Sequence, residues 1–304
     1  MQIGPHLLVH SSHDDTEVRR ACLRGNLVRV VPGRYVRTAH WMSLSLDEKE
    51  IMRIVAAVTT LHGTAVVSRL SAAALWGMPR LGAPPKRVHV TDSRITQTVQ
   101  NAFTVKHAGS LGPAEVAERF GVLVTTPTRT ALDIALTASF RQSVVVLDHC
   151  LRSGLVTKDG LRRDLERQPT ARGSARAARA IDFADHRANR PGESLSRVVM
   201  LEARIEAPEL QAPFDGPDSQ HADVDFFWPG LGLVGEFDGM TKYRDSGRWS
   251  GLKPHEVVIA EKVREDWIRA DPAVRGFVRW TWHDVVASGR LAALLSAAMR
   301  PRLR

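Results

Sequence analysis

The sequence predicts an α/β chain of the α+β type that contains more than one domain. At 304 residues, the chain is long enough to form two or more hydrophobic cores. Its composition, 43% hydrophobic and 25% charged, is that of a folded globular protein rather than of a disordered one. Segments with apolar residues at helical spacing are interspersed with segments in which apolar and polar residues alternate, as they do in strands.

Charge and cysteine content narrow the class of protein. The formal net charge is +9 and the pI is about 10.2, which favours a polyanionic partner, most simply nucleic acid. The two cysteines, Cys22 and Cys150, suggest neither a disulfide framework nor a zinc site. The sequence starts without a signal-peptide pattern, and no uncharged apolar run reaches the length of a membrane span. We therefore expect a cytoplasmic protein without a membrane partner.

Residues 1–80 predict a winged helix-turn-helix-like DNA-binding domain. Residues 14–25 have the pattern of a short helix, and two Val-rich runs at 27–31 and 34–36 flank Pro32-Gly33, a hairpin signature. A helix followed by a small basic hairpin is how a winged helix ends, and such a wing would lay arginines along a phosphate backbone. The alternative is a plain hairpin with solvated arginines. The predicted DNA-binding residues are Arg29, Arg34 and Arg37.

Residues 81–165 predict a mixed α/β middle region, which two helices precede. The first helix is expected at 46–61, and Ser71 is expected to cap a second one that ends at Gly77-Pro79. Either Thr126 or Thr128 is expected to cap a helix at 129–138. The other predicted elements are strands at 87–91, 103–107 and 123–126 and helices at 140–152 and 158–167. The Arg-rich stretch 166–190 is expected to be a linker, either helical or flexible.

Residues 191–304 predict a second domain built on a small mixed α/β sheet. A helix at 193–207 precedes two alternating strands within 221–243, which a tight turn at Pro229-Gly230 joins. Residues 256–270 begin extended and end helical in this prediction. A strand at 276–282 and an amphipathic helix at 283–299 complete the domain, and this order of elements is that of a mixed sheet.

Four acids on the two strands of this hairpin suggest a site. Asp223 and Asp225 share one face of their strand, because side chains alternate, and Glu236 and Asp238 share a face of the next. If the turn is centred between positions 230 and 231, Asp225 lies directly across from Glu236, within reach of one shared cation. Carboxylates beside apolar residues cost free energy unless a metal ion, a cationic side chain or water satisfies them.

The order of motifs in the second half carries a resemblance. Glu193 lies on a predicted helix, Asp225 lies in VDFFWP and Glu236 lies in GEFDG, and EKVREDWIRA and GFVRWTW follow. Residues 192–285 thus resemble the PD-(D/E)XK nuclease superfamily, and within it the very-short-patch-repair (Vsr)-like endonuclease domain. The resemblance implies a restriction-endonuclease-like α/β sheet and a metal-dependent endonuclease that hydrolyses DNA phosphodiester bonds.

The same resemblance implies roles for individual residues. Asp225 and Glu236 would bind Mg²⁺, or Mn²⁺ in its place, with Glu193 and Asp238 as further ligands. The lysine that the family pattern places two residues after the second acid is replaced here by Asp238. Two downstream lysines are the candidates for its catalytic role, Lys242 and Lys262.

A second set of motifs lies in the first half. LVRVVPGRYV, followed by helical and strand segments and then by TPTRTALDIA, resembles the AbiEi-type antitoxin or regulator family. Members of that family belong to type IV toxin–antitoxin systems and carry an N-terminal winged helix. The expected partners are therefore DNA and a cognate toxin, and a homodimer is a further expectation.

Three hypotheses follow from these patterns. The first is a metal-dependent DNA endonuclease that its N-terminal half docks on duplex DNA. The second is a DNA-binding antitoxin or transcriptional regulator whose nuclease-like domain is degenerate or serves interaction. The third is a structural α/β domain whose acids are solvated at the rim of a sheet. Convergence of Glu193, Asp225 and Glu236 on one pocket, with a lysine nearby, would support a site, whereas scattered acids would end the nuclease hypothesis.

Overall fold

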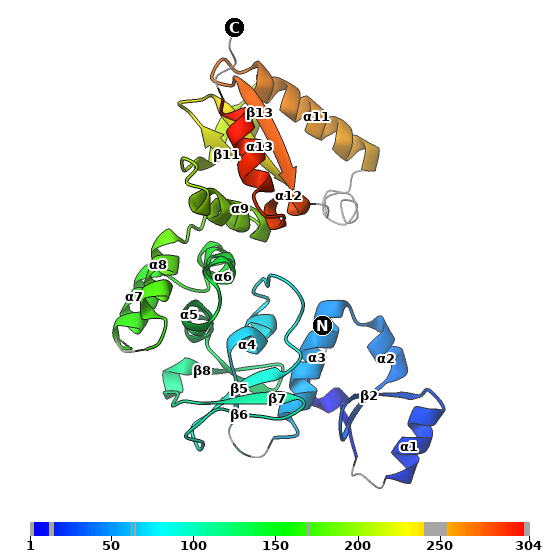
Figure 1. Cartoon of the computed structure of the whole chain (residues 1–304). Coiled ribbons are helices and arrows are strands. Elements are labelled where there is room, and N and C mark those ends of the chain that lie inside the picture. Colours follow the sequence, from blue (N-terminus) through cyan, green and yellow to red (C-terminus); the bar gives the residue numbers. More distant parts are fainter. Residues whose placement is uncertain are drawn as a thin grey trace. The chain divides into compact units, whose positions relative to one another are not determined.

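The computed structural model describes residues 3–11, 15–61, 63, 65–168, 171–239 and 254–300. The chain forms two compact units, Met1–Phe183 and Ala184–Arg304, each of which is described by itself (Figure 1). Both units combine helices with β-sheet, so the predicted α+β class is confirmed. Within the described residues, no helix is both long enough and apolar enough to cross a membrane.

Unit 1 begins with a small three-stranded sheet and a helix. The elements are β1 (Val9–His10), α1 (Thr16–Leu23), β2 (Leu27–Val31) and β3 (Arg34–Arg37), and the strand order is β1-β3-β2. α2 (Thr38–Ser43) and α3 (Leu46–Val58) follow the hairpin. The described residues ahead of the hairpin hold one α-helix, α1, which lies beside β2 (Figure 1). They thus form a helix and a wing, but not a complete helix-turn-helix.

Local sequence signals explain these boundaries. Asp15 caps α1, because its Oδ1 accepts hydrogen bonds from two backbone N–H groups of the first turn at 3.1 and 3.0 Å. Gly33 makes the hairpin turn with a φ of +74°, a conformation that other residues rarely adopt. α3 opens with a capping box, in which the side chains of Ser45 and Glu48 each accept a hydrogen bond from the other's backbone N–H.

A six-stranded mixed sheet forms the larger part of unit 1. Its strands, in the spatial order β6-β7-β5-β4-β9-β8, are β4 (Val66–Val67), β5 (Val88–Asp92), β6 (Val99–Gln100), β7 (Thr104–Ala108), β8 (Val116–Arg119) and β9 (Val122–Thr125). The helices of this part are α4 (Arg69–Trp76), α5 (Pro127–Thr137), α6 (Phe140–Arg152), α7 (Lys158–Glu166) and α8 (Ser174–Phe183).

Two predicted helix caps have different outcomes. α4 starts after Ser68, so the predicted cap Ser71 lies inside the helix, where its Oγ accepts a hydrogen bond from the His89 backbone N–H at 2.9 Å. α5 is capped by Thr126, one of the two predicted residues, whose Oγ1 accepts a hydrogen bond from the Arg129 N–H at 3.4 Å.

One hydrophobic core joins the two parts of unit 1. Val36 of the hairpin, Val55 of α3 and Val90 of β5 are fully buried in the same apolar cluster. The expected boundary at residue 80 therefore falls inside a unit rather than between units. Similarly, the stretch expected as a linker at 166–190 contains α8, which packs on α5, α6 and α7 through buried Ala177, Ala180 and Ile181. The division between the units falls after Phe183, at the end of this helix.

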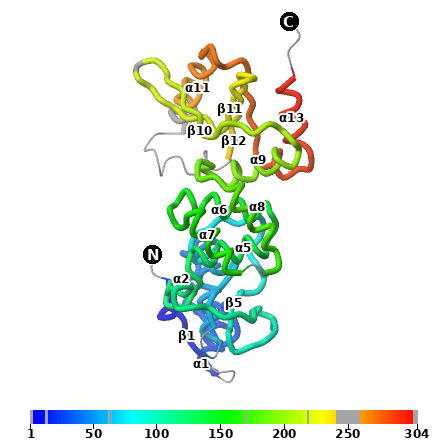
Figure 2. Tube along the Cα trace, turned by 90° about the vertical axis from the view of Figure 1, so that its left-hand side faces the viewer, coloured from blue at the N-terminus to red at the C-terminus, as the bar shows by residue number. Residues whose placement is uncertain are grey.

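Unit 2 is built on a four-stranded sheet in the order β10-β11-β12-β13. Its elements are α9 (Pro191–Glu202), β10 (Glu209–Asp215), β11 (His221–Trp228), β12 (Leu233–Asp238), α11 (Pro254–Ala270), β13 (Gly276–Thr281), α12 (Trp282–Val286) and α13 (Arg290–Ala298). The first three strands are antiparallel neighbours that lie side by side, and β13 runs parallel to β12 (Figure 2). β10 was not predicted, and the expected single helix at 283–299 is divided at Gly289, whose φ is +73°.

The two faces of this sheet are covered by different helices. On β12, Phe237 lies against Gly192 of α9, whereas Glu236 bonds Arg264 of α11, and neighbouring residues of a strand point to opposite faces. α9 therefore covers one face and α11 the other. A Cβ atom at Gly192 would lie 2.0 Å from Phe237 Cζ, so the glycine lets the first turn of α9 approach the sheet and positions the next residue, Glu193.

Replacement of Gly192 by alanine tests this close approach. Phe237 is buried and its ring has little room to move, so we expect Gly192→Ala to lower the free energy of unfolding by about 1–3 kcal/mol, the usual cost of overpacking. Gly230→Ala is the matched control, because a Cβ atom there would have no neighbour within 4 Å. Urea denaturation of both variants measures the difference, and equal stability would mean that the helix does not depend on this contact.

Candidate nucleic-acid interface and carboxylate site

Two of the three predicted DNA-binding arginines lie together on the outer face of the β2–β3 hairpin. In the strand register, Leu27 pairs with Arg37 and Arg29 pairs with Tyr35, so these four side chains share one face. Val36 on the opposite face is buried in the core. Arg29 and Arg37 are exposed, and within the described part of the chain neither makes an ion pair.

The third predicted arginine, Arg34, instead makes hydrogen bonds within unit 1. Its Nε donates a hydrogen bond to Thr59 Oγ1 at 2.9 Å, Nη1 donates to the Gly33 carbonyl at 2.9 Å, and Nη2 donates to the Thr59 carbonyl. Thr59 is the C-cap residue of α3, and the carbonyl groups at the end of a helix lack partners within it. Arg34 thus fastens the hairpin to α3 and has its donors engaged.

α1 adds further cations beside the hairpin. Arg19, Arg20 and Arg24 are exposed, while Val18 of the same helix is buried. Together with Arg29 and Arg37 they form the basic end of unit 1. Arg29 and Arg37 could contact a phosphate backbone there without first breaking an ion pair with a described carboxylate. The sequence pattern predicted this helix directly before the hairpin, but it did not single out the arginines of the helix as DNA contacts.

In unit 2, the strand register brings two of the predicted metal ligands opposite each other. Phe226 pairs with Gly235 and Trp228 with Leu233, so the turn is centred between positions 230 and 231. Continuing this register places Asp225 across from Glu236, on the face that α11 covers. Glu236 is buried, Asp225 is half-buried and Asp223 is exposed.

Glu193 approaches the same carboxylates from α9. Gln211 of β10 connects them, because its Nε2 donates a hydrogen bond to Glu193 Oε2 at 3.2 Å and to Asp225 Oδ1 at 3.4 Å. The backbone N–H of Asn189 donates to the same Glu193 oxygen at 2.8 Å, and that of Phe237 donates to Asp225 Oδ2 at 2.8 Å. Glu193 of α9, Asp225 of β11 and Glu236 of β12 therefore lie near one another, since the charges of the latter two act on Glu193.

Gln211 is a member of this site that the sequence pattern did not reveal. It lies across from Asp225 in the register of β10 and β11, and its φ of +49° is left-handed. Such a conformation costs a residue other than glycine about 1–3 kcal/mol, so the surrounding contacts must hold it in place. Its strand lies in a stretch for which no strand was predicted.

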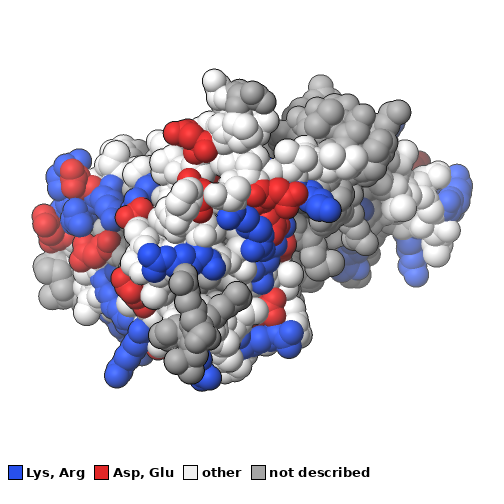
Figure 3. Space-filling model, turned by 90° about the horizontal axis from the view of Figure 1, so that it is seen from above, with Lys and Arg blue, Asp and Glu red and all other residues white. Residues whose placement is uncertain are grey.

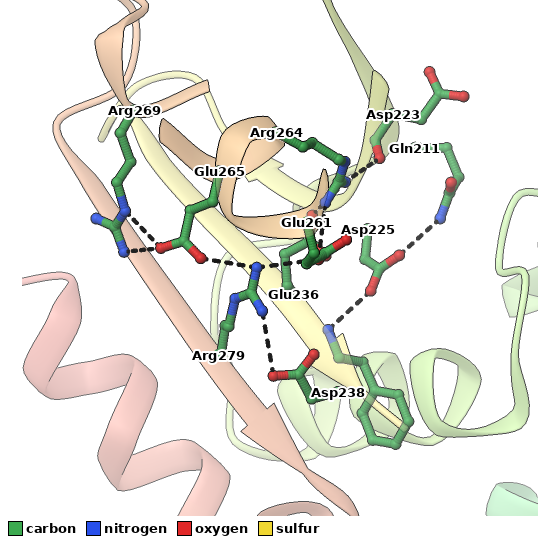
Figure 4. Close-up of polar contacts among 11 residues, drawn as sticks. Gln211, Asp223, Asp225, Glu236, Asp238, Glu261, Arg264, Glu265, Arg269 and Arg279 are labelled. Atoms are coloured by element: carbon green, nitrogen blue, oxygen red, sulfur yellow. Dashed lines mark hydrogen bonds and ion pairs between the residues drawn. The ribbon is translucent and has the colours of Figure 1, made fainter. Parts of the chain in front are cut away.

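Among the residues that the structure describes, arginines supply the cations of the site (Figure 4). Arg264 of α11 donates from Nη2 to Glu236 Oε1 at 2.8 Å and to the Asp223 carbonyl at 2.9 Å. Arg279 of β13 then links this pair to the rest of α11. Its ion pairs reach Glu261 at 3.2 Å, Glu265 at 2.9 Å and Asp238 at 3.6 Å. Acidic and basic side chains also lie next to each other on the face shown in Figure 3.

Of the two predicted lysines, the structure describes Lys262. Lys262 is exposed on α11, and since residues two apart on a helix lie roughly 200° apart around its axis, it points away from the side on which Arg264 reaches Glu236. Lys242 lies outside the described residues. Asp238, which stands where the family pattern has lysine, is half-buried and pairs with Arg279.

The described carboxylates do not fit a divalent cation as they are arranged. Their hard oxygen atoms suit Mg²⁺, but Glu236 already bonds a guanidinium, and backbone N–H groups occupy Asp225 and Glu193. Among the residues that the structure describes, no group of three or more His, Cys, Asp or Glu side chains could hold a metal ion.

Burial gives Glu193 an unusual proton affinity. Its desolvation and the negative charges of Asp225 and Glu236 raise the pKa of Glu193 to about 8, although the Asn189 N–H and Arg190 oppose this rise. A carboxyl group that stays protonated to neutral pH can lie beside other carboxylates without adding a further negative charge.

Comparisons with known proteins match one part of unit 1 to a family model and most of the chain to individual proteins. Residues 64–183 match the family model described as "AbiEi antitoxin C-terminal domain", and the match ends where α8 ends. Over 252 residues, the chain is 27% identical to "Uncharacterized protein MT2308" and to "Uncharacterized protein Rv2248" of two Mycobacterium tuberculosis strains, which covers 81% of this chain and 91% of each relative. The crystal structure of RV2827C protein from Mycobacterium tuberculosis aligns with a TM-score of 0.38 at 15% identity, over 68% of this chain and 78% of that one.

Replacement of Glu193 by glutamine tests its protonation in the folded state. Because the pKa is raised from 4.5 to about 8, the folded chain binds more protons than the unfolded chain between these values, and stability is lost as the pH rises through this window. In this window, the free energy of unfolding of Glu193→Gln should fall less steeply with pH than that of the wild type, by up to about 1.4 kcal/mol per pH unit. Urea denaturation from pH 5 to pH 8.5 measures the slope.

Exposed Glu209 of β10 provides the control for that experiment. Glu209→Gln should keep the wild-type dependence of stability on pH, because this side chain is solvated. A wild-type slope that persists in Glu193→Gln would show that another group takes up the proton.

Proposed function

We propose that the chain is a DNA-binding regulator of the AbiEi antitoxin type. The observation that carries the proposal is the match of residues 64–183 to the AbiEi antitoxin C-terminal domain. The basic end of unit 1 supports it, because exposed arginines of a hairpin and of the helix beside it suit a phosphate backbone. The net charge of +9 is consistent with such a partner.

In this proposal the hairpin supplies general affinity for duplex DNA. Arg29 and Arg37 contact phosphates, and each contact releases counterions, which makes binding weaker at higher salt. Arg34 positions the hairpin on α3 and does not touch DNA. A cognate toxin is the second partner of the regulator, as the family resemblance implies, and a homodimer stays a prediction that the stoichiometry of DNA binding tests.

Substitution of single arginines distinguishes residues that contact DNA from a residue that stabilises the fold. We expect Arg29→Ala and Arg37→Ala each to weaken binding of a random-sequence duplex and to reduce the slope of log K against log[salt] by about 1, with an unchanged melting temperature. Arg34→Ala should instead lower the melting temperature, because Thr59 loses its partner at a cost of about 1–2 kcal/mol. Fluorescence anisotropy at several salt concentrations and calorimetry provide the two measurements.

Exposed Arg172 serves as the control for loss of one positive charge. Its replacement by alanine should leave both the salt slope and the melting temperature unchanged. If Arg29→Ala and Arg37→Ala bind DNA as the wild type does, with the wild-type slope, the hairpin is not the DNA contact.

A metal-dependent DNA endonuclease is the second candidate. One observation favours it, namely that Glu193, Asp225 and Glu236 gather from α9, β11 and β12. In this candidate these acids and Asp238 would bind Mg²⁺ or Mn²⁺, and Lys242 or Lys262 would replace the family lysine. The engagement of Glu236 by Arg264 argues for the regulator instead.

A plasmid assay separates the two candidates. As a regulator, the pure full-length chain should leave supercoiled plasmid intact in Mg²⁺ and in Mn²⁺ while it still binds DNA. Nicking that requires either metal, and that Asp225→Ala or Glu236→Ala abolishes, would establish the endonuclease. Nicking that survives both substitutions would indicate a contaminating nuclease, which a second purification removes.

A further inference from the structure

The carboxylate site of unit 2 contains a cation of its own. The side chain of Glu236 is 4% exposed, and a carboxylate at such a position needs a positive charge or several hydrogen-bond donors. Arg264 provides both, because its Nη2 lies 2.8 Å from Glu236 Oε1 and also donates to the Asp223 carbonyl at 2.9 Å. One guanidinium thus ties β11 and β12 to α11 (Figure 4).

Arg264 is itself held in position by neighbouring charges. Its Nη1 lies 3.3 Å from Glu261 Oε1, one helical turn earlier on α11. Glu261 also accepts a bond from Arg279 of β13 at 3.2 Å, and Arg279 in turn pairs with Glu265 at 2.9 Å. A planar guanidinium with fixed donors can satisfy several oxygen atoms at once, which the point charge of a lysine cannot do in the same geometry.

A divalent cation would compete with this arrangement. To coordinate Glu236 it would have to bind a carboxylate whose Oε1 already bonds Arg264, and it would then lie next to a second positive charge. The Arg264 side chain, which is 23% exposed, would have to move and give up its bonds to Asp223 and Glu261 as well. Removing one partner of a buried ion pair leaves the other charge uncompensated, which is strongly unfavourable.

We propose that Arg264 is the resident cation of the carboxylate site, and that it takes the place which a metal ion would otherwise occupy at Asp225 and Glu236. Unit 2 then keeps the carboxylate arrangement of a metal site as a scaffold that is stable without metal. This inference does not depend on how unit 1 binds DNA, so either one can fail while the other holds.

Manganese binding by the full-length chain tests the proposal. Mn²⁺ alone is titrated into wild type and into Arg264→Met, a substitution that keeps the length of the side chain and removes its charge, and free Mn²⁺ is followed by its paramagnetic resonance signal. We expect Arg264→Met to bind one Mn²⁺ at least ~10-fold more tightly than wild type, a difference of about 1.4 kcal/mol. The double variant Glu236→Gln with Arg264→Met should lose this gain.

Arg269→Met is the matched control, because Arg269 lies on the same helix and pairs with Glu265 rather than with Glu236. It should bind Mn²⁺ as weakly as wild type does. Tight binding by wild type that Glu236→Gln abolishes would overturn the proposal, and so would an Arg264→Met chain that binds no better than wild type.

Thermal unfolding provides a second readout in case Arg264→Met is unstable. The wild-type melting temperature should be the same in EDTA and in Mn²⁺, whereas that of Arg264→Met should fall in EDTA and rise again when Mn²⁺ is added. If the variant is unfolded in EDTA, Mn²⁺ should refold it. An unfolded variant that Mn²⁺ cannot refold, or a wild type that Mn²⁺ stabilises through Glu236, would contradict the proposed role of Arg264.

Discussion

The ion pair between Glu236 and Arg264 is the interaction on which unit 2 depends. Glu236 is buried on a central strand, where an unpaired charge would be too costly for the fold to keep. Its partner comes from α11, which begins at Pro254, whereas β12 ends at Asp238. The pair thus fixes how α11 covers one face, while Gly192 fixes how closely α9 covers the other. The acids between the two helices owe their arrangement to both contacts.

Much of the fold follows from local patterns in the sequence, and the exceptions have physical reasons. The helices α3 and α6 and the strands β11 and β12 were predicted because their apolar periodicity is strong. β10 was missed because prolines and glycines surround it and only tertiary pairing with β11 makes it a strand. α8 lies in a stretch whose recurring arginines among Gly, Ala and Ser residues suggest a linker, although its small apolar residues at helical spacing form a buried side.

The candidate site was predictable in part. Alternation and turn position were enough to place Asp225 across from Glu236, since both depend on the hairpin alone. The role of Arg264 was not predictable, because the side of α11 that faces the sheet is decided by long-range packing. The family pattern predicts a lysine at the site, and Lys262 lies two residues before Arg264, the side chain that pairs with Glu236. Gln211 and the anchoring role of Arg34 depend equally on contacts between distant segments.

The bond between Arg34 and Thr59 has a consequence for the modularity of the chain. It ties the wing to the end of α3, and α3 buries its apolar side in the core that β5 and β9 complete. The small N-terminal sheet is therefore not an independent module that could be cut out or grafted onto another chain. A fragment that stopped before β5 would expose the apolar side of α3 to water. The hairpin that we propose contacts DNA thus depends for its folding on strands of the part that matches the antitoxin domain.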